Sequence, residues 1–584
     1  MQNTSDKKRH IQLDLKAKVS FGNRKAAKFG LPVLLILVVS AAIAPALSGT
    51  KGFLPAAQAS PASPDFNGDG FKDLAVGVPF EEIGPSEIFN AGGVNVIYGS
   101  ASGLASDGNQ FWSQNSPEIL DVSEPFDNFG AAVTTGDFNN DGYSDLAVGV
   151  PREAIGASNA IQGAGAVNVI YGSASGLTAD GNQVWTQNSP GILDVAESNF
   201  DPDLDDDDRI PDRFGTALIS GDFNNDGYGD LAVGVPGESV LTDSGHIYNA
   251  GAVNIIYGSA SGLTADGNQI LSLESEGMVS GAAFSDFYGS VLASADLNGD
   301  GYVDLAVGIP NKSVDAAGEP LIEASGAVHV IYGSAAGLTS DGNQIWTQES
   351  EGILGDAGEF NFFGDALAAG DFNNDGYGDL AVGVPSQDLA VVIIANTGAV
   401  QIIYGSASGL TADGNQVWTQ ESPGILDSSG EADQFGDALA AGDFNNDGYS
   451  DLAVGVPGED VGMLPTLNAG AVNVIYGSAS GLTADGNQIW AQNSPEILNT
   501  ALESDLFGSA LATGDFNNDG YSDLAVGVPG EDVGAGPMTN AGAVNIIYGS
   551  ASGLTAEGNQ FWSQNSPGIV ESSDPFDLFG RALA

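Results

Sequence analysis

A nine-residue segment of the form D-x-N-x-D-G-x-x-D occurs seven times, starting at residues 65, 137, 222, 296, 371, 443 and 515. Ca²⁺ takes roughly six to eight oxygen ligands. Side-chain oxygens at positions 1, 3 and 5 can converge on one cation when the backbone curls tightly, and the Gly at position 6 permits that turn. A carbonyl at position 7 and a carboxylate at position 9 can complete the shell. The spacing therefore predicts one calcium site per copy, seven in all.

The predicted ligands are the side chains at positions 1, 3, 5 and 9 and the backbone carbonyl at position 7. They are Asp65, Asn67, Asp69, Phe71, Asp73, Asp137, Asn139, Asp141, Tyr143, Asp145, Asp222, Asn224, Asp226, Tyr228, Asp230, Asp296, Asn298, Asp300, Tyr302, Asp304, Asp371, Asn373, Asp375, Tyr377, Asp379, Asp443, Asn445, Asp447, Tyr449, Asp451, Asp515, Asn517, Asp519, Tyr521 and Asp523. An all-oxygen set with three carboxylates disfavours zinc and copper and favours calcium over magnesium. Acidic β-turns without a metal are the alternative.

Short strands must position these segments. Each copy continues directly into a two-sidedly apolar strand, LAVGVP or LAVGIP, which excludes the helix that follows an EF-hand loop. The phrases GAVNVIYG, SASGLTADGNQ, a Trp-centred segment such as QVWTQ, and an FG dipeptide then recur with few changes. Each repeat is expected to form four strands: the small residues after FG (Gly436–Ala441, for example), LAVGVP, GAVNVIYG and QVWTQ as the outer strand.

Four-stranded sheets repeated around an axis form a β-propeller. The predicted fold is all-β: a seven-bladed β-propeller of four-stranded blades over residues 60–584. The inner-strand phrase is missing before the first metal segment, yet the chain finishes with it at 579–584. The C-terminal strand is therefore expected to complete the first blade and close the ring. A reading frame truncated within a repeat is the other explanation.

The FG dipeptide, the GAV phrase and the Asp-rich nine-residue segment resemble the FG-GAP repeats of integrin α-subunit propellers over about residues 65–584. The resemblance implies a propeller whose loops between the first and second strands bind Ca²⁺ on one face. Integrins keep such loops in only some blades, whereas every blade has one here. The integrin leg domains, membrane span and inserted ligand-binding domain are missing, so adhesion is suggested by the family alone.

Residues 1–59 are interpreted as a signal peptide. Nine of the 15 basic residues lie there, before the apolar run 31–47 and the A-Q-A pattern at 57–59. An uncleaved anchor is the alternative. The protein is expected to be secreted, extracellular or at the cell surface, without membrane insertion after cleavage. From residue 60 onward six basic residues face 74 acidic ones, which excludes nucleic acid as a partner.

The sequence offers little support for a catalytic site, and we expect that the protein is not an enzyme. The three His residues, His10, His246 and His329, do not assemble a repeated triad. The segments after each VP (80–90, 311–324 and 458–468, for example) vary on a constant scaffold and are expected to share one face away from the metal loops. The acidic stretch 200–213 is either a further cation site or a solvated loop.

Two functions remain. The first is a monomeric, extracellular calcium-binding module that binds or adheres to a glycan or protein. The second is a calcium-rigidified structural protein of an envelope or matrix without a discrete ligand. A glycan-active enzyme is a third, weaker reading. A shared aromatic or polar cluster on the variable face would favour the binding module, and a featureless acidic face would favour the structural protein.

Overall fold

The computed structural model describes residues 64–84, 88–156, 161–197, 210–242, 245–315, 321–388, 394–462, 466–534 and 539–584. The predicted leader, residues 1–59, and most of the acidic stretch 200–213 lie outside these ranges. Every regular element in the described ranges is a β-strand. Within the same ranges, no helix has the length and apolar character that a membrane span needs.

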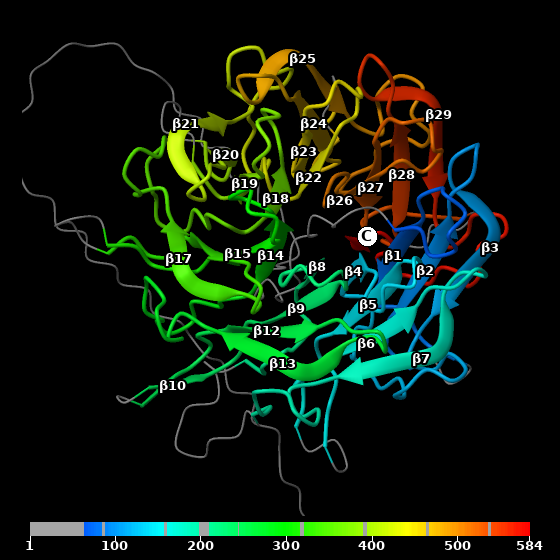
Figure 1. Ribbon diagram of the computed structural model, residues 1–584. Coiled ribbons are helices and arrows are strands. Elements are labelled where there is room, and N and C mark those ends of the chain that lie inside the picture. Colours follow the sequence, from blue (N-terminus) through cyan, green and yellow to red (C-terminus); the bar gives the residue numbers. More distant parts are fainter. Residues whose placement is uncertain are drawn as a thin grey trace, which may run out of the picture. The chain divides into compact units, whose positions relative to one another are not determined.

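Residues 64–584 form seven four-stranded antiparallel sheets that follow one another around a ring (Figure 1). In each sheet the strand after FG is innermost, because the inner strands of neighbouring blades contact one another, and the Trp-containing strand is outermost. The all-β, seven-bladed propeller predicted from the repeats is therefore confirmed.

The strands occupy the same four places in every blade. The inner strands are β4 (Ala132–Gly136), β8 (Leu218–Gly221), β14 (Val291–Ala295), β18 (Leu367–Gly370), β22 (Leu439–Gly442), β26 (Ala510–Gly514) and β30 (Ala582–Leu583). The second strands are β1 (Leu74–Val78), β5 (Asp145–Val150), β9 (Asp230–Val235), β15 (Asp304–Ile309), β19 (Asp379–Val384), β23 (Asp451–Val456) and β27 (Asp523–Val528). The third strands are β2 (Gly93–Tyr98), β6 (Ala166–Tyr171), β12 (Ala252–Tyr257), β16 (Ala327–Tyr332), β20 (Ala399–Tyr404), β24 (Ala471–Tyr476) and β28 (Ala543–Tyr548). The outer strands are β3 (Ala105–Trp112), β7 (Thr178–Trp185), β13 (Thr264–Leu271), β17 (Thr339–Trp346), β21 (Thr411–Trp418), β25 (Thr483–Trp490) and β29 (Thr555–Trp562).

The last strand completes the first blade, as the ends of the repeat pattern predict. β30 pairs with β1 in an antiparallel register that sets Leu583 opposite Val76. The backbone of Ala584 exchanges two hydrogen bonds with that of Ala75, with N···O distances of 2.8 and 3.1 Å. The first sheet therefore has the order β3-β2-β1-β30, so β1 is paired along its inner edge like the second strands of the other blades.

Two details differ from the sequence prediction. The outer strand was expected at QVWTQ, but it begins with the preceding TADGNQ residues and ends at the Trp. The register shift between the third and outer strands, at Val169 and Tyr171 in the second blade, accommodates this longer strand. The third blade also has an additional hairpin, β10 (Val240–Thr242) with β11 (Gly245–Ile247), in its variable segment.

The hydrophobic cores lie between blades. The core that joins the first and second blades combines Val94 and Val96 of β2 with Val148 and Val150 of β5. Backbones approach closely there: a Cβ on Gly77 would lie 2.2 Å from the carbonyl oxygen of Gly130 in the next blade. The Gly of LAVGV is thus needed for blade-to-blade contact. Trp112 packs into the same core, as expected of an aromatic residue at a fixed repeat position.

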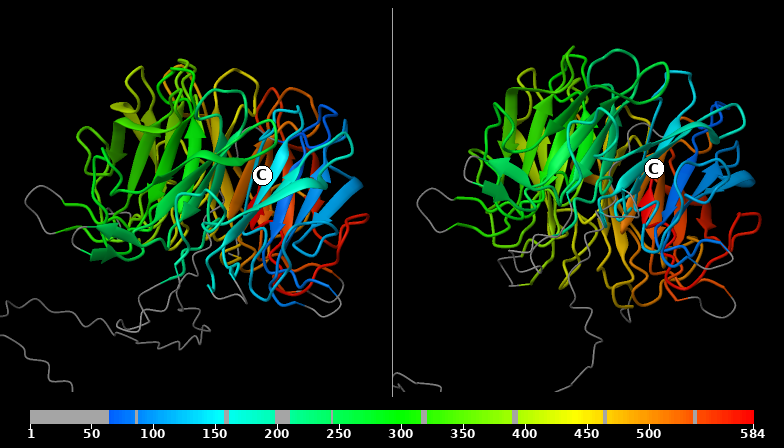
Figure 2. Two further views of the ribbon diagram at one scale, coloured as in Figure 1. Left: turned by 60° about the horizontal axis from the view of Figure 1, so that its bottom comes forward. Right: turned by 90° about the horizontal axis from the view of Figure 1, so that it is seen from below.

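The antiparallel strands give the propeller two faces, seen edge-on in Figure 2. One face carries the connections from first to second strands, which contain the Asp-rich segments, and those from third to outer strands. The opposite face carries the variable connections after VP and the connections from each outer strand to the next inner strand. The variable segments share a face away from the Asp-rich loops, as predicted. We call these the loop face and the variable face.

Candidate metal centres

The second Asp-rich loop, which runs from Asp137 to Asp145 between β4 and β5, shows the geometry of all seven. The N–H of Asp141 donates to Asp137 Oδ1 at 3.0 Å and to Asn139 Oδ1 at 2.9 Å. The N–H of Gly142 donates to Asp137 Oδ2 at 2.9 Å, and that of Tyr143 to Asp141 Oδ1 at 3.0 Å. Gly142 has a φ of +91°, which explains why this position is Gly.

The same four backbone-to-side-chain bonds recur in the other six loops. They fix the oxygens of positions 1, 3 and 5 on one tight turn. Each of these oxygens has a second lone pair that can still face a cation. The turn is therefore organised in the way that the calcium prediction requires.

The position-9 carboxylate is held apart from the turn. Asp145 is fully buried and accepts the N–H of Phe138 at its Oδ2 and the N–H of Gly172 at its Oδ1, both at 2.9 Å. Burial raises the pKa of Asp145 to about 8; the charges of Asp137 and Asp141 add to that rise, and the two N–H bonds oppose it. A bound cation would favour the charged form.

All seven position-9 side chains have this environment and are fully buried. Burial raises the pKa to about 7 for Asp73, Asp304, Asp379 and Asp451, and to about 8 for Asp145, Asp230 and Asp523. In each case the two accepted N–H groups come from the loop and from the end of the third strand. The carboxylate therefore ties the loop to its blade.

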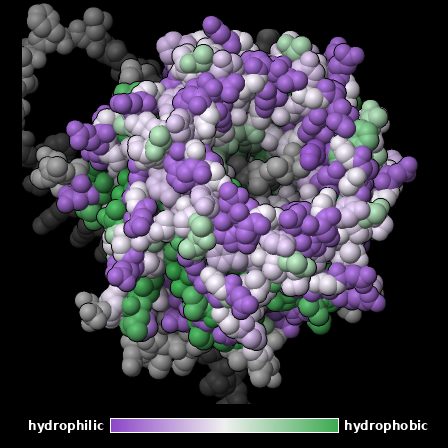
Figure 3. Space-filling model, in the orientation of Figure 1, coloured by the Kyte–Doolittle hydropathy of each residue, from purple (hydrophilic) through white to green (hydrophobic). Residues whose placement is uncertain are grey.

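The seven loops are joined into a ring. The carbonyl of position 1 in each loop accepts a hydrogen bond from the N–H of position 8 in the next, as from Ser144 to Asp65 at 3.0 Å. The bond from Lys72 to Asp515, at 3.4 Å, closes the ring between the seventh and first blades. Any cation that orders one loop would thus also brace its neighbours. Figure 3 looks onto this face, which is largely hydrophilic.

The structure brings the predicted ligands together only in part. Positions 1, 3, 5 and 7 share one turn, whereas the position-9 carboxylate points toward backbone N–H groups. Within the described ranges, no loop sets three carboxylate groups within 4.8 Å of one another. The donor set fits a hard cation, and calcium in the seven loops stays a prediction.

Comparison with known families identifies the repeat. The FG-GAP repeat matches seven segments, residues 57–93, 129–170, 214–253, 288–331, 363–403, 435–475 and 507–546. These matches coincide with the seven loops and the second and third strands around them. The chain is an FG-GAP repeat protein.

Its relatives include integrin α subunits, as the motifs indicated. This FG-GAP protein is 30% identical to integrin alpha-5 of Xenopus laevis over 46% of its own length and 22% of that subunit. It is 36% identical to phosphatidylinositol-glycan-specific phospholipase D of Bos taurus over 30% of its own length and 19% of that enzyme. The chain therefore matches about a fifth of the length of these curated relatives.

Solved structures resemble the FG-GAP propeller only distantly. AofleA from Arthrobotrys oligospora aligns over 74% of this chain and 85% of its own at 7% identity, with a TM-score of 0.32. A rhamnogalacturonan lyase from Bacillus licheniformis aligns over 68% and 63%, at 11% identity and a TM-score of 0.29. These values support no comparison of function.

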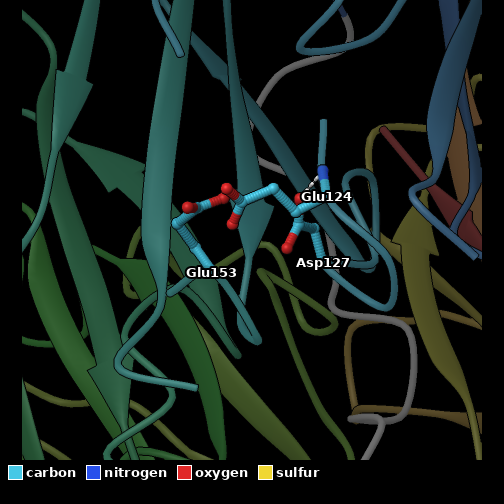
Figure 4. A group of neighbouring side chains, drawn as sticks. All are labelled: Glu124, Asp127 and Glu153. Atoms are coloured by element: carbon cyan, nitrogen blue, oxygen red, sulfur yellow. Dashed lines mark hydrogen bonds between the residues drawn. The ribbon is translucent and has the colours of Figure 1, made fainter. Parts of the chain in front are cut away.

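The variable face of the FG-GAP propeller has an acidic cluster that the sequence analysis missed. Glu153 follows β5, whereas Glu124 and Asp127 precede β4, and the three carboxylates lie within 4.8 Å of one another (Figure 4). Glu153 is 3% exposed and Asp127 is 2% exposed. Burial raises the pKa of Glu153 to about 8 and that of Asp127 to about 7, and the negative charges nearby add to both shifts. The available signal was a Glu two residues after VP and an Asp two residues before FG.

Exposed apolar groups lie beside the outer strands and on the variable face. Each segment that follows an outer strand sets an aliphatic side chain, 48–58% exposed, beside the next outer strand: Leu120, Leu193, Val279, Leu354, Leu426, Leu498 and Val570. Each donates its N–H to an Asn of the neighbouring outer strand, as Leu120 does to Asn182 Oδ1 at 2.8 Å. On the variable face, Phe89 and Phe126 are each about half exposed and pack edge to face with ring centroids 5.2 Å apart.

Proposed function

We propose that this FG-GAP protein is a secreted calcium-binding propeller that binds an extracellular glycan or protein on its variable face. The observation that carries the proposal is the exposed aromatic pair on that face, which a purely structural acidic body would not need. Phe89 and Phe126 are about half exposed there and pack edge to face. Exposed aromatic groups in that setting are typical of binding surfaces.

The loop face has the complementary role of stiffening the scaffold. Calcium in the loops would neutralise their carboxylates, and the ring of hydrogen bonds would pass that order from blade to blade. The function is binding rather than catalysis, and the protein acts as a monomer. Export rests on the basic and apolar composition of residues 1–59. The integrin relatives add support at the level of the family.

The test is retention of the full chain on arrays of glycans and matrix proteins, in calcium and in chelator. We expect calcium-dependent retention on a defined ligand. The variant F89S/F126S should lose at least about tenfold in affinity, which corresponds to about 1.4 kcal/mol. Asp180→Ser, exposed on the outer strand β7, is the matched control and should bind like the wild type.

No retention in either buffer, from protein shown to be folded, would reject the binding function. It would leave the structural role as the remaining account of the calcium loops. Retention that is equal for the wild type and F89S/F126S would place the ligand elsewhere on the propeller. Turnover of a glycan on the array would contradict the non-catalytic role.

A further inference from the structure

The acidic cluster at Glu153 belongs to a pocket that is repeated around the variable face. Three segments form it: the residues just after one outer strand, the residues just before the next inner strand, and the residues just after the next second strand. In the pocket between the first and second blades they supply Gln114, Asp127 and Glu153. Gln114 Nε2 donates to Glu153 Oε2 at 2.7 Å, and all three side chains are at least 97% buried.

Five of the seven blade junctions repeat this Glu, Asp and Gln combination. The Glu and Asp pairs are Glu81 with Asp577, Glu153 with Asp127, Glu238 with Asp212, Glu459 with Asp433, and Glu531 with Asp505. In each pocket a Gln donates its amide N–H to the Glu: Gln564, Gln114, Gln187, Gln420 and Gln492. Each junction thus sets two carboxyl groups side by side, and all of them except the half-buried Glu459 are buried.

The same five Gln side chains leave an acceptor without a partner. The Oε1 atoms of Gln114, Gln187, Gln420, Gln492 and Gln564 are buried and have no hydrogen-bond donor. If the amide were rotated by 180°, its oxygen would face the Glu carboxylate and the two acceptors would repel each other. The observed orientation, with the NH₂ group toward the Glu, is therefore the favourable one. Each of these Gln side chains is at least 98% buried. Buried oxygens are normally paired, so an unpaired oxygen beside two carboxyl groups indicates that a cation or a proton donor belongs next to it.

At the two remaining junctions, a side chain of the protein itself provides the positive charge or the hydrogen-bond donor. In the fourth blade Lys312 replaces the Glu, and its Nζ lies 2.7 Å from Asp286 Oδ2 and 2.6 Å from the carbonyl of Gly281. In the fifth blade the pair is Gln387 with Asn361. There Asn361 Nδ2 donates to Gln348 Oε1 at 2.9 Å, and Gln348 Nε2 donates to Gln387 Oε1 at 2.8 Å.

Other positions change together with these replacements. Beside Lys312 the donor Gln is replaced by the apolar Leu273, which is buried. A further pocket position is Asp121, Asp194, Asp427, Asn499 or Glu571 at the five acidic junctions. It is Ser280 beside Lys312 and Gly355 beside Asn361. This position therefore has a carboxylate or amide side chain at the five acidic junctions and lacks one at the two junctions where the chain provides a cation or an amide donor.

We propose that each of the five acidic pockets binds one calcium ion through its Glu, Asp and Gln oxygens, and that Lys312 and Asn361 take the place of the ion at the other two junctions. A divalent ion balances the two carboxylates, whereas a monovalent ion leaves one charge buried without compensation. The donors are all oxygen, which suits a hard cation. The ions would lie between blades and tie them together on the face opposite the loops. The proposal does not depend on calcium in the loops.

The test is a count of calcium bound to the full chain after equilibrium dialysis, by elemental analysis. The variant D127N/E153Q copies the amide pair that the fifth blade already uses, so it is expected to fold. We expect twelve ions in the wild type, seven in loops and five in pockets, and eleven in this variant. D107N/D180N, which removes two exposed carboxylates from outer strands, is the matched control and should keep twelve.

An unchanged count in D127N/E153Q would overturn the proposal and indicate carboxyl groups that share a proton. The variant D137N/D141N empties one loop and leaves the pockets intact. Its count falls by one only if loops bind calcium, so failure of the loops and failure of the pockets give different results. In the opposite direction, L273Q/S280D/K312E rebuilds a pocket at the fourth blade and should add one ion. A folded triple variant that binds no additional calcium would contradict the assigned ligands.

Discussion

The two faces of the propeller hold their carboxylates in different ways. On the loop face, each acidic group comes from nine consecutive residues, and the side chains of positions 3 and 5 are at least partly exposed to solvent. On the variable face, each pocket joins three segments from two blades, and nearly all its side chains are buried. All seven loops keep their Asp and Asn positions, whereas two of the seven pockets have changed.

The difference follows from the cost of burying charge. A solvated carboxylate tolerates the loss of its cation, because water replaces it. A buried pair has no such substitute and requires a cation, a proton or a change of residue. The Lys312–Asp286 ion pair and the Gln387–Asn361 amide pair are two such changes within one chain. The pockets thus contain their own natural controls, which the loops lack.

Removal of calcium from the wild type should have the largest effect. A site occupied at 100 times its dissociation constant contributes about 2.7 kcal/mol to stability. With sites on both faces, chelator is expected to lower the melting temperature by more than about 10 °C. Calorimetry in calcium and in excess chelator measures this difference. An unchanged melt would exclude a stabilising role for calcium on either face.

Truncation of one acidic side chain on each face should destabilise the protein by different amounts. Glu153→Ala leaves the Nε2 of Gln114 without its acceptor in a buried site, at a cost of about 2–4 kcal/mol in calcium. Asp141→Ala removes a solvent-exposed carboxylate, so we expect a smaller loss in calcium and almost none in chelator. Urea unfolding in both buffers provides the comparison. A larger loss of unfolding free energy for Asp141→Ala than for Glu153→Ala would contradict the conclusion that charge is more costly to leave unpaired on the variable face.

Lys312 offers a test that needs no metal. Lys312→Met leaves Asp286 buried without its ammonium partner and should cost about 3 kcal/mol, with little change between calcium and chelator. The double variant D286N/K312Q removes both charges and should recover most of that loss. Calcium-dependent rescue of Lys312→Met would mean that the ion does not need the Glu and Gln oxygens.

The variant D127N/E153Q should show a small effect of opposite sign in the two buffers. In chelator it removes a buried pair of like charges and is expected to melt about 1–3 °C above the wild type, from a gain of about 1 kcal/mol. In calcium it loses one ion and should melt lower than the wild type. Parallel melting curves of the two proteins measure both shifts. A variant that melts lower in chelator as well would indicate that the carboxyl pair stabilises the blade junction by itself.

The fold and the loops could be predicted from the sequence because their signals are local and repeated. The turn from Asp137 to Asp145, the strand that follows it and the closing strand at Leu583 are all evident in contiguous residues. The pockets could not be predicted in the same way. Gln114, Asp127 and Glu153 are separated by up to 39 positions, and only the packing of two blades brings them together. The burial of the position-9 Asp also depends on the third strand, at Gly172.

A calcium anomalous-difference map from crystals of the full chain tests the central claim most directly. The account predicts peaks at the seven loops and at the five pockets formed with Glu81, Glu153, Glu238, Glu459 and Glu531. It predicts no peak beside Lys312 or between Gln387 and Asn361. Peaks at the loops alone would contradict calcium on the variable face, and a peak beside Lys312 would contradict the replacement of the ion by the ammonium group.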